Sequence, residues 1–159
     1  MEENKELERA TQVYEKILQI LEKDEWKYER NDENLAVRFT VRGDDIPMDF
    51  TVYVDPSPGL LRVQSWLPFE INKDKMIDAA VAVCAINLRM KNGSFDFDFS
   101  DGTIRFKVTQ TCIDGQLDEE VFRYLLFLSS YTVDEYNDKM LMLSKGGLKL
   151  EDFLEEINS

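Results

Sequence analysis

Residues 95–108 alternate between apolar and polar side chains in two runs, and Asp101-Gly102 separates the runs. An alternation with period two is typical of a strand that buries one face. Asp-Gly between two such runs is a strong signal for a two-residue hairpin turn. The segment therefore predicts a β-hairpin, and with it an antiparallel sheet. The apolar side chains are Phe95, Phe97 and Phe99 before the turn and Ile104, Phe106 and Val108 after it.

A two-residue turn also fixes which side chains face each other across the hairpin. In this register, phenylalanines meet apolar side chains on one face and carboxylates meet cations on the other. Each pair of opposite charges contributes about 0.2–1 kcal/mol. The predicted pairs are Phe99 with Ile104, Phe97 with Phe106, Asp98 with Arg105 and Asp96 with Lys107.

The acidic residues at 96–102 also invite comparison with a calcium-binding loop of the EF-hand kind. That loop needs a glycine at position six and a bidentate glutamate at position twelve. Counted from Asp96, these positions hold Asp101 and Lys107. A cation at the twelfth position would repel the ion, so the sequence favours the hairpin over a metal site. We predict no metal and no other cofactor.

The chain contains no histidine and only two cysteines, Cys84 and Cys112. Without histidine, it lacks the commonest general base, the usual activator of nucleophiles and the commonest ligand of zinc or iron. The cysteines stand in apolar surroundings, which indicates reduced core thiols in a cytoplasmic protein. We therefore predict that the protein is not an enzyme.

Nineteen basic and 32 acidic residues give a formal net charge of −13. This balance argues against nucleic acid and anionic membranes as partners, because both are bound chiefly through lysine and arginine. The longest apolar run, Ala79 to Ile86, is eight residues long, far below the ~20 of a membrane span. The first residues have no apolar segment of a secretory signal. We expect a cytoplasmic protein.

The remaining periodicities predict helices around a strand-rich centre. Residues 3–23 have the spacing of an amphipathic helix. Four short strands joined by tight turns follow at 26–30, 35–41, 48–54 and 61–66. Residues 73–91, capped by Asn72, predict a helix whose broad apolar surface would be buried against the sheet or against a second subunit.

The C-terminal part predicts three further helices. Asp118 caps the first, which Ser129-Ser130 interrupts; Thr132 and Glu135 form a capping box that starts the second, and residues 150–157 form the third. Strands grouped in runs with helices between them predict an α+β fold with a mostly antiparallel sheet. A chain of 159 residues suits one domain, residues 1–159.

One stretch resembles a known family. A helix that ends in Ile86-Asn87-Leu88 runs into Gly93-x-Phe95 and the acidic hairpin, and the stretch LSKGG at 143–147 closes a later helix. This pattern resembles the YbjN-like domains, which share the fold of the type III secretion chaperones. The resemblance implies a small, acidic, cytoplasmic bacterial protein, often dimeric, that holds another protein in a chaperone-like or regulatory role. It carries over no catalytic residue.

The first candidate site lies on the strands of residues 35–66. Arg38, Arg42, Arg62, Gln64 and Trp66 are predicted to share the face opposite the apolar side chains. A tryptophan beside arginines is typical of protein interfaces. The alternative is an ordinary solvated face with Trp66 covered by a neighbouring helix.

The second candidate is the helix after Asp118, which carries apolar residues beyond a single stripe. The additional residues are Phe122, Leu126 and Phe127. A helix with two apolar faces needs two neighbours. The second neighbour is either the same helix of another subunit, in a homodimer, or the helices at 133–144 and 149–157 of the same chain.

The third candidate is enzymatic. Asp44, Asp45, Asp49 and Asp55 lie around turns and could supply a pair of carboxylates. Aspartate at turns more often caps backbone amides. A small-ligand-binding protein or a carboxylate-based enzyme is thus the alternative function, and binding of another protein is the predicted one.

Overall fold

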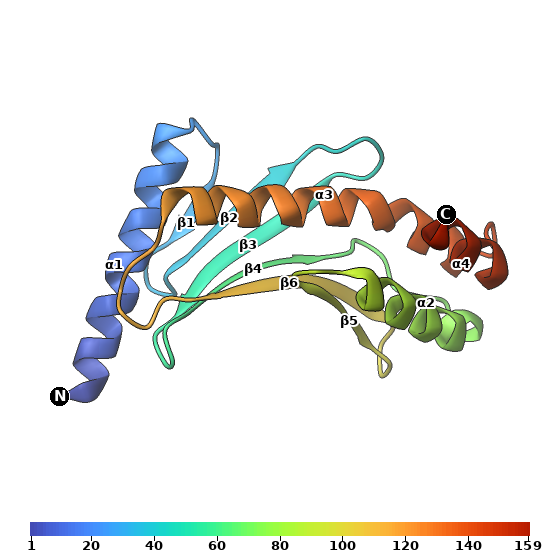
Figure 1. The fold of residues 1–159 in the computed structure, drawn as a ribbon, viewed down its shortest axis with the longest axis horizontal. Helices are drawn as coiled ribbons and strands as arrows, with labels where there is room; N and C mark the ends of the chain where they lie inside the picture. Colours follow the sequence, from blue (N-terminus) through green and yellow to red (C-terminus); the bar gives the residue numbers. More distant parts are fainter.

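The computed structural model describes residues 1–159 as one six-stranded antiparallel sheet with four α-helices (Figure 1). The strand order is β1-β2-β3-β4-β6-β5, and neighbouring strands are antiparallel throughout. The predicted α+β fold is therefore confirmed. The elements are α1 (Glu2–Lys23), β1 (Glu29–Asn31), β2 (Ala36–Val41), β3 (Met48–Asp55), β4 (Leu60–Trp66), a 3-10 turn (Lys73–Lys75), α2 (Met76–Arg89), β5 (Ser94–Asp98), β6 (Thr103–Thr111), α3 (Glu119–Ser144) and α4 (Leu150–Asn158).

One face of the sheet carries the apolar core. The alternation predicted for the strands is present, since every second side chain of β3 and β4 is buried. All four helices contribute to the same apolar cluster. Figure 1 shows α1 and α3 lying across the sheet, with α2 and α4 gathered at one end of it. An ion pair of 2.8 Å between Arg123 and Asp24, at the end of α1, joins α3 to α1.

The predicted hairpin is present as β5 and β6, but its turn is longer than expected. Four residues, Phe99 to Gly102, connect the strands. Gly102 has φ +80°, and its amide donates to the carbonyl oxygen of Asp98 at 2.8 Å. Because the loop is longer, the predicted register is wrong by two residues. The observed pairs include Phe97 with Ile104 and Phe95 with Phe106.

A shift of two residues leaves each side chain on its predicted face but changes the charge pairs. Asp96 forms ion pairs with Arg105 at 2.6 Å and with Lys107 at 2.8 Å. Asp96 thus forms an ion pair with Lys107 as predicted, but the residue directly opposite Lys107 is Ser94 and not Asp96. The pair of Asp98 and Arg105 is wrong, because Asp98 instead accepts hydrogen bonds from the backbone amide and the hydroxyl of Ser100.

The helix α3 is continuous where two helices were predicted. The hydroxyl of Ser129 donates to the carbonyl oxygen of Leu125 at 2.6 Å, and Ser130 makes the equivalent bond one residue later. Serine hydroxyls bonded in this way do not end a helix. The predicted interruption is therefore wrong, as is the capping box of Thr132 and Glu135.

The helix starts agree with the sequence in one case and differ in the other. Asp118 caps α3 as predicted, since its Oδ1 accepts from the amide of Val121 at 3.0 Å. The side chain of Asn72 makes no capping bond. A 3-10 turn at Lys73–Lys75 precedes α2.

Asn87 ties α2 to the outer edge of β5. Its amide nitrogen donates to the carbonyl oxygen of Phe95, and its Oδ1 accepts from the amide of the same residue, both at 2.8 Å. At the start of β5, Gly93 has φ +78°, and a Cβ there would lie 2.7 Å from the ring of Phe106. The motif that links Asn87, Gly93 and Phe95 therefore has a structural role.

The two sides of α2 differ in exposure. Ala79, Ala82, Val83 and Ile86 are buried in the core. The opposite side exposes four apolar residues, which we call the α2 stripe: Ile77, Val81, Cys84 and Leu88. Cys112 is buried as predicted, but the prediction of a core thiol at Cys84 is wrong. No helix of the chain is long and apolar enough to cross a bilayer.

Candidate functional site

The side of the sheet opposite the core contributes nothing to the apolar cluster and has no helix packed on it. We call this surface the open face. The register aligns its side chains in rows across the strands, so that Thr51 lies between Arg38 and Gln64, and Lys107 continues the row. The open face includes Arg38, Thr40, Asp49, Thr51, Tyr53, Arg62, Gln64, Trp66, Arg105, Lys107 and Thr109.

Trp66 lies at the end of β4 and remains 49% exposed. No helix covers it, so the interpretation that placed it beneath a neighbouring helix is wrong. The guanidinium carbon of Arg105 lies 5.1 Å from the centroid of the Trp66 ring. A guanidinium at this distance attracts the ring and holds it in place. The indole is therefore a positioned apolar surface that water still reaches.

Arg62 and Gln64 lie on the same strand as Trp66. The guanidinium carbon of Arg62 is 5.5 Å from the centroid of the Tyr53 ring. Arg62 Nε and Gln64 Oε1 are shielded from solvent and have no hydrogen-bond partner. Such unsatisfied groups cost about 1–3 kcal/mol each. The open face thus holds one unpaired donor and one unpaired acceptor close to its exposed tryptophan.

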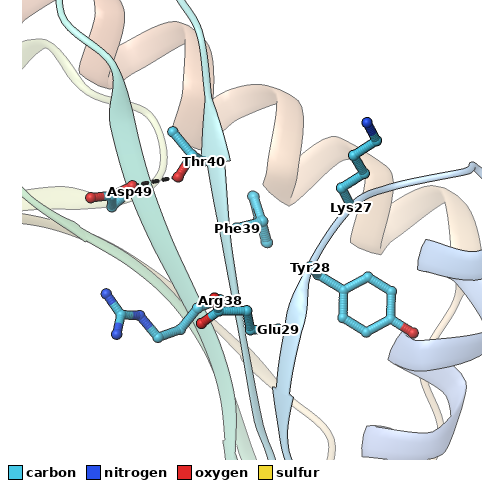
Figure 2. Close-up of a pocket in the computed structure, with 7 residues that line it drawn as sticks. All are labelled: Lys27, Tyr28, Glu29, Arg38, Phe39, Thr40 and Asp49. Carbon is cyan, nitrogen blue, oxygen red and sulfur yellow. Dashed lines mark hydrogen bonds between the residues drawn. The ribbon is translucent and has the colours of Figure 1, made fainter.

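Arg38 lies on β2 and forms no ion pair within the chain. A hollow of about 620 Å³ opens beside it (Figure 2). Within this hollow the hydroxyl of Thr40 donates to Asp49 at 2.6 Å. The lining residues are Lys27, Tyr28, Glu29, Arg38, Phe39, Thr40 and Asp49. The hollow is polar apart from two aromatic side chains.

Arg42 lies just beyond the end of its strand. β2 ends at Val41, so Arg42 lies in the loop that leaves the sheet. It is four positions from Arg38, which corresponds to about 13 Å of extended chain. The candidate surface on the sheet itself contains Arg38, Arg62, Gln64 and Trp66. It also contains Arg105 and Lys107 of β6, which the sequence analysis did not assign to it.

Arg105 and Lys107 could have been found from the sequence, because both stand at alternating positions of a predicted strand. They were interpreted only as partners of carboxylates within the hairpin. The structure shows that their strand, β6, is the direct neighbour of β4. This adjacency depends on long-range pairing, which the periodicity of one strand does not reveal.

The second candidate surface is smaller than expected. Phe122 and Leu126 are 0% and 5% exposed, so the chain itself covers them. Phe127 is 70% exposed and stacks on Tyr131 with 6.1 Å between the ring centroids. Of the three residues predicted to form additional apolar surface, only Phe127 is open to a partner.

The four aspartates of the third candidate are dispersed. Asp49 accepts from Thr40 on the open face, and Asp55 caps the amide of Ser57 at 3.1 Å. Asp49 and Asp55 are six positions apart along β3, which corresponds to about 20 Å, more than a carboxylate pair for glycoside hydrolysis spans.

The other two aspartates lie in the exposed loop between β2 and β3. The amide of Asp44 donates to Asp134 Oδ1 at 3.0 Å. The negative charge of Asp138 raises the pKa of Asp45, with smaller contributions from burial and from Asp134 and Asp44. The loop thus meets the acidic side chains of α3, and repulsion between carboxylates accounts for this pKa.

An uncovered sheet face with an exposed tryptophan and arginines has the composition of a surface that binds proteins. Residues 14–142 match the YbjN family, whose description reads "Putative bacterial sensory transduction regulator". The chain belongs to this family, and the resemblance found in the sequence is confirmed. No curated protein matches the sequence.

The fold is similar to a chain in the crystal structure of the ExsC-ExsE complex. The TM-score is 0.53 with 12% sequence identity, and the alignment covers 81% of this chain and 93% of that chain. At this identity the likeness concerns the fold alone. It agrees with the predicted architecture of an antiparallel sheet packed with helices.

Proposed function

We propose that this protein is a non-enzymatic module of the cytoplasm that binds another protein through the open face and acts in a regulatory or chaperone-like role. The observation that carries the proposal is Trp66, which is half exposed and held by Arg105 on a sheet face without helices. We further propose that residues 1–159 act as one domain, since all helices and the sheet share one apolar cluster.

The family description, a sensory transduction regulator, supports a role that works through binding. The solved structure of similar fold described above is a complex of two proteins, which supports the proposal that the partner of this chain is also a protein. An extended segment of a partner fits a sheet face best. Its backbone offers both carbonyl oxygens and amides, the groups that exposed polar side chains of a sheet face can bind.

A small-ligand-binding protein is the second candidate, and the hollow beside Arg38 is the observation in its favour. Its volume of about 620 Å³ lies in the range of ligand sites, which are 300–1,000 Å³ in typical proteins. Such sites are lined mostly by apolar side chains. Only Tyr28 and Phe39 of this lining are apolar, so the geometry favours a protein partner.

We also propose that the protein works as a homodimer. Several apolar side chains remain exposed on α2 and α3, and exposed apolar patches usually mark association. Sedimentation at high micromolar concentration tests this proposal directly. A particle of twice the chain mass of 18.6 kDa is expected, and a monomer would refute it.

The partner-binding proposal is tested by affinity purification from the native host followed by mass spectrometry. Tagged wild type is compared with Trp66→Ala and Arg62→Ala, and with Leu7→Ala as the control. Leu7 is a half-exposed apolar residue of α1, away from the open face. Truncation of an interface tryptophan costs about 2 kcal/mol or more, which corresponds to a Kd increase of about 30-fold.

The expected result is a set of proteins that wild type and Leu7→Ala retain and that both open-face variants lose. Thermal melts check that the variants are folded. If both variants capture the same proteins in the same amounts as wild type, the open face is ordinary surface and the proposal is wrong.

A further inference from the structure

Three aromatic residues lie exposed along α3, and no other part of the chain covers them. We call them the α3 row: Tyr124, Phe127 and Tyr131, which are 51%, 70% and 60% exposed. Intervals of three and four residues place the rings on one side of the helix, over about 10 Å of its axis. Because Phe127 and Tyr131 are already stacked on each other, the free chain holds this aromatic surface in place.

Acidic side chains continue the same side of α3 toward its C-terminus. Glu135 and Asp138 follow Tyr131 at intervals of four and three residues. Asp134 lies beside them and accepts from the amide of Asp44 at 3.0 Å, which holds the loop between β2 and β3 against α3. We call the five carboxylates of this region the acidic end: Asp44, Asp45, Asp134, Glu135 and Asp138.

The charge of the acidic end is not compensated within the chain. None of its five carboxylates forms an ion pair. Repulsion from Asp138 is the largest of the effects that raise the pKa of Asp45, although Lys139 acts against it. Before the α3 row, by contrast, Arg123 pairs with Glu120 at 2.6 Å. The aromatic surface therefore leads from paired charges at one end to unpaired carboxylates at the other.

This arrangement determines which chemistry the surface can bind. The faces of aromatic rings attract guanidinium and ammonium groups, and arginine binds carboxylates through two parallel hydrogen bonds. A partner therefore needs apolar side chains over the α3 row and cations over the acidic end. From Tyr124 to Asp138 the side chains of this surface recur at intervals of three and four, which is the spacing along which a second helix packs.

We propose that the α3 row and the acidic end together bind a cationic amphipathic helix of another protein. The apolar side of that helix lies on the three rings, and its arginine or lysine residues lie at one end, over Glu135 and Asp138. This inference goes beyond the function proposed above, because α3 packs on the core side of the sheet and shares no residue with the open face. The open face presents arginines and a lysine, so it attracts a cationic helix less.

Two other occupants fit this surface less well. In an antiparallel pair centred on the α3 row, a second copy of the chain would place Glu135 beside Glu120 of the other copy. In a parallel pair, the two acidic ends would meet. Like charges brought together at an interface weaken binding. An anionic membrane surface is repelled by the same carboxylates.

The charge requirement is tested with two synthetic peptides of about 18 residues, or five helical turns. Both carry leucine at intervals of three and four, and one end is rich in arginine in the first peptide and in glutamate in the second. Fluorescence anisotropy measures their Kd for the full chain. The arginine peptide is expected to bind, and the glutamate peptide is expected to bind at least about 10-fold more weakly.

The contribution of the acidic end is tested with two double variants of equal net charge. Glu135→Gln with Asp138→Asn removes two charges of the acidic end, and Glu3→Gln with Glu8→Gln removes two exposed charges of α1. Loss of two exposed ion pairs should raise the Kd of the arginine peptide by about 5-fold. The α1 variant should change this Kd by less than about 2-fold, because salt screens distant charges.

The contribution of the α3 row is tested with Phe127→Ala, and Leu7→Ala on α1 is the control. Phe127→Ala should raise the Kd of the arginine peptide by about 10-fold or more, and Leu7→Ala should leave it unchanged. Trp66→Ala should also leave it unchanged, because the peptide does not use the open face. Thermal melts check the folding of every variant.

The helical conformation of the partner is tested on the peptide. Circular dichroism should show that the arginine peptide gains helicity when it binds the chain. A proline in the middle of the peptide should weaken binding by about 100-fold, because proline disrupts a helix. A proline peptide that binds as tightly as the original overturns the helix.

The remaining outcomes separate this inference from the function proposed above. The inference is overturned if the arginine peptide does not bind, if the glutamate peptide binds equally well, or if both charge variants lose affinity equally. Loss of binding in Trp66→Ala places the peptide on the open face and overturns this inference alone. A dimer of the chain that Phe127→Ala dissociates, in sedimentation, assigns the α3 row to a second copy and overturns it as well. Partner capture that does not depend on Trp66 overturns the proposed function and leaves the site on α3 standing.

Discussion

The contact between Asn87 and the edge of β5 gives the sharpest prediction for stability. The side chain of Asn87 makes two hydrogen bonds of 2.8 Å to the backbone of Phe95, one as donor and one as acceptor. It thereby takes the place that a seventh strand would occupy at this position. Asn87→Ala removes both bonds and leaves a part-buried amide and carbonyl of Phe95 without their partner.

The expected loss follows from these two bonds. Each contributes a net 0.5–1.5 kcal/mol in typical proteins, so the pair contributes about 1–3 kcal/mol. Alanine gains at most about 0.7 kcal/mol over asparagine as a helix former. The free energy of unfolding should therefore fall by about 1–2 kcal/mol. In urea, this corresponds to a midpoint lower by about 0.5–1 M.

Urea unfolding followed by circular dichroism measures this change. Asn4→Ala is the control, because Asn4 is an exposed residue of α1 whose side chain makes no hydrogen bond within the chain. Asn87→Asp keeps an acceptor for the Phe95 amide but places an oxygen against the Phe95 carbonyl, so it should be at least as unstable at neutral pH. Equal stability of Asn87→Ala and Asn4→Ala, or a wild-type stability of Asn87→Asp, would refute the reasoning.

Three further predictions concern the hairpin and the open face. In urea unfolding, Gly93→Ala should lower the free energy of unfolding by about 2 kcal/mol more than Gly146→Ala does. Both glycines have positive φ, but only at Gly93 would a Cβ meet a ring carbon at 2.7 Å. Equal losses in the two variants would contradict the clash. Burial raises the pKa of the Asp96 carboxyl, and hydrogen bonds from its two cationic neighbours on β6 outweigh this and hold the pKa below its usual value. The stabilisation by the ionised Asp96 is then complete above pH ~4 and lost as the pH falls through the lowered pKa. Wild type should therefore lose more stability than Asp96→Asn between pH 5 and pH 2. Parallel profiles of stability against pH would contradict the ion pairs. Acrylamide should quench Trp26→Phe, which keeps the exposed Trp66, more strongly than Trp66→Phe, and the opposite order would show that Trp66 is covered.

The strands and their faces could be predicted from the sequence because side-chain alternation is a local property. Met48, Phe50 and Val52 point into the core as the alternation indicates. The family resemblance also rested on local features, and the structure explains one of them through the bonds of Asn87. These parts needed no knowledge of distant contacts.

The errors arose where a local signal competed with another interaction. Asp101-Gly102 indicated a two-residue turn, but the amide of Gly102 bonds to Asp98 and lengthens the loop. Ser129-Ser130 indicated a helix end, yet both hydroxyls bond to carbonyl oxygens within α3. In both cases a hydrogen bond to a backbone carbonyl oxygen stabilises a conformation different from the one that the dipeptide, Asp-Gly or Ser-Ser, had indicated.

The candidate site was predicted in part for the same reason. Arg38, Arg62 and Trp66 share a face because their strands alternate, which the sequence shows. The contribution of Arg105 depends on β6 pairing with β4, which follows only from the assembled sheet. Whether a helix covers the face is likewise a property of the whole fold.

Site-specific photo-crosslinking in the native host tests the central claim most directly. A photoreactive amino acid replaces Thr109, which is exposed on β6 directly beside Arg62, and a control chain carries it in place of Leu7 on α1. The account predicts a covalent adduct with another protein at position 109 and none at position 7. Adducts at position 7 with none at position 109 would contradict a partner on the open face.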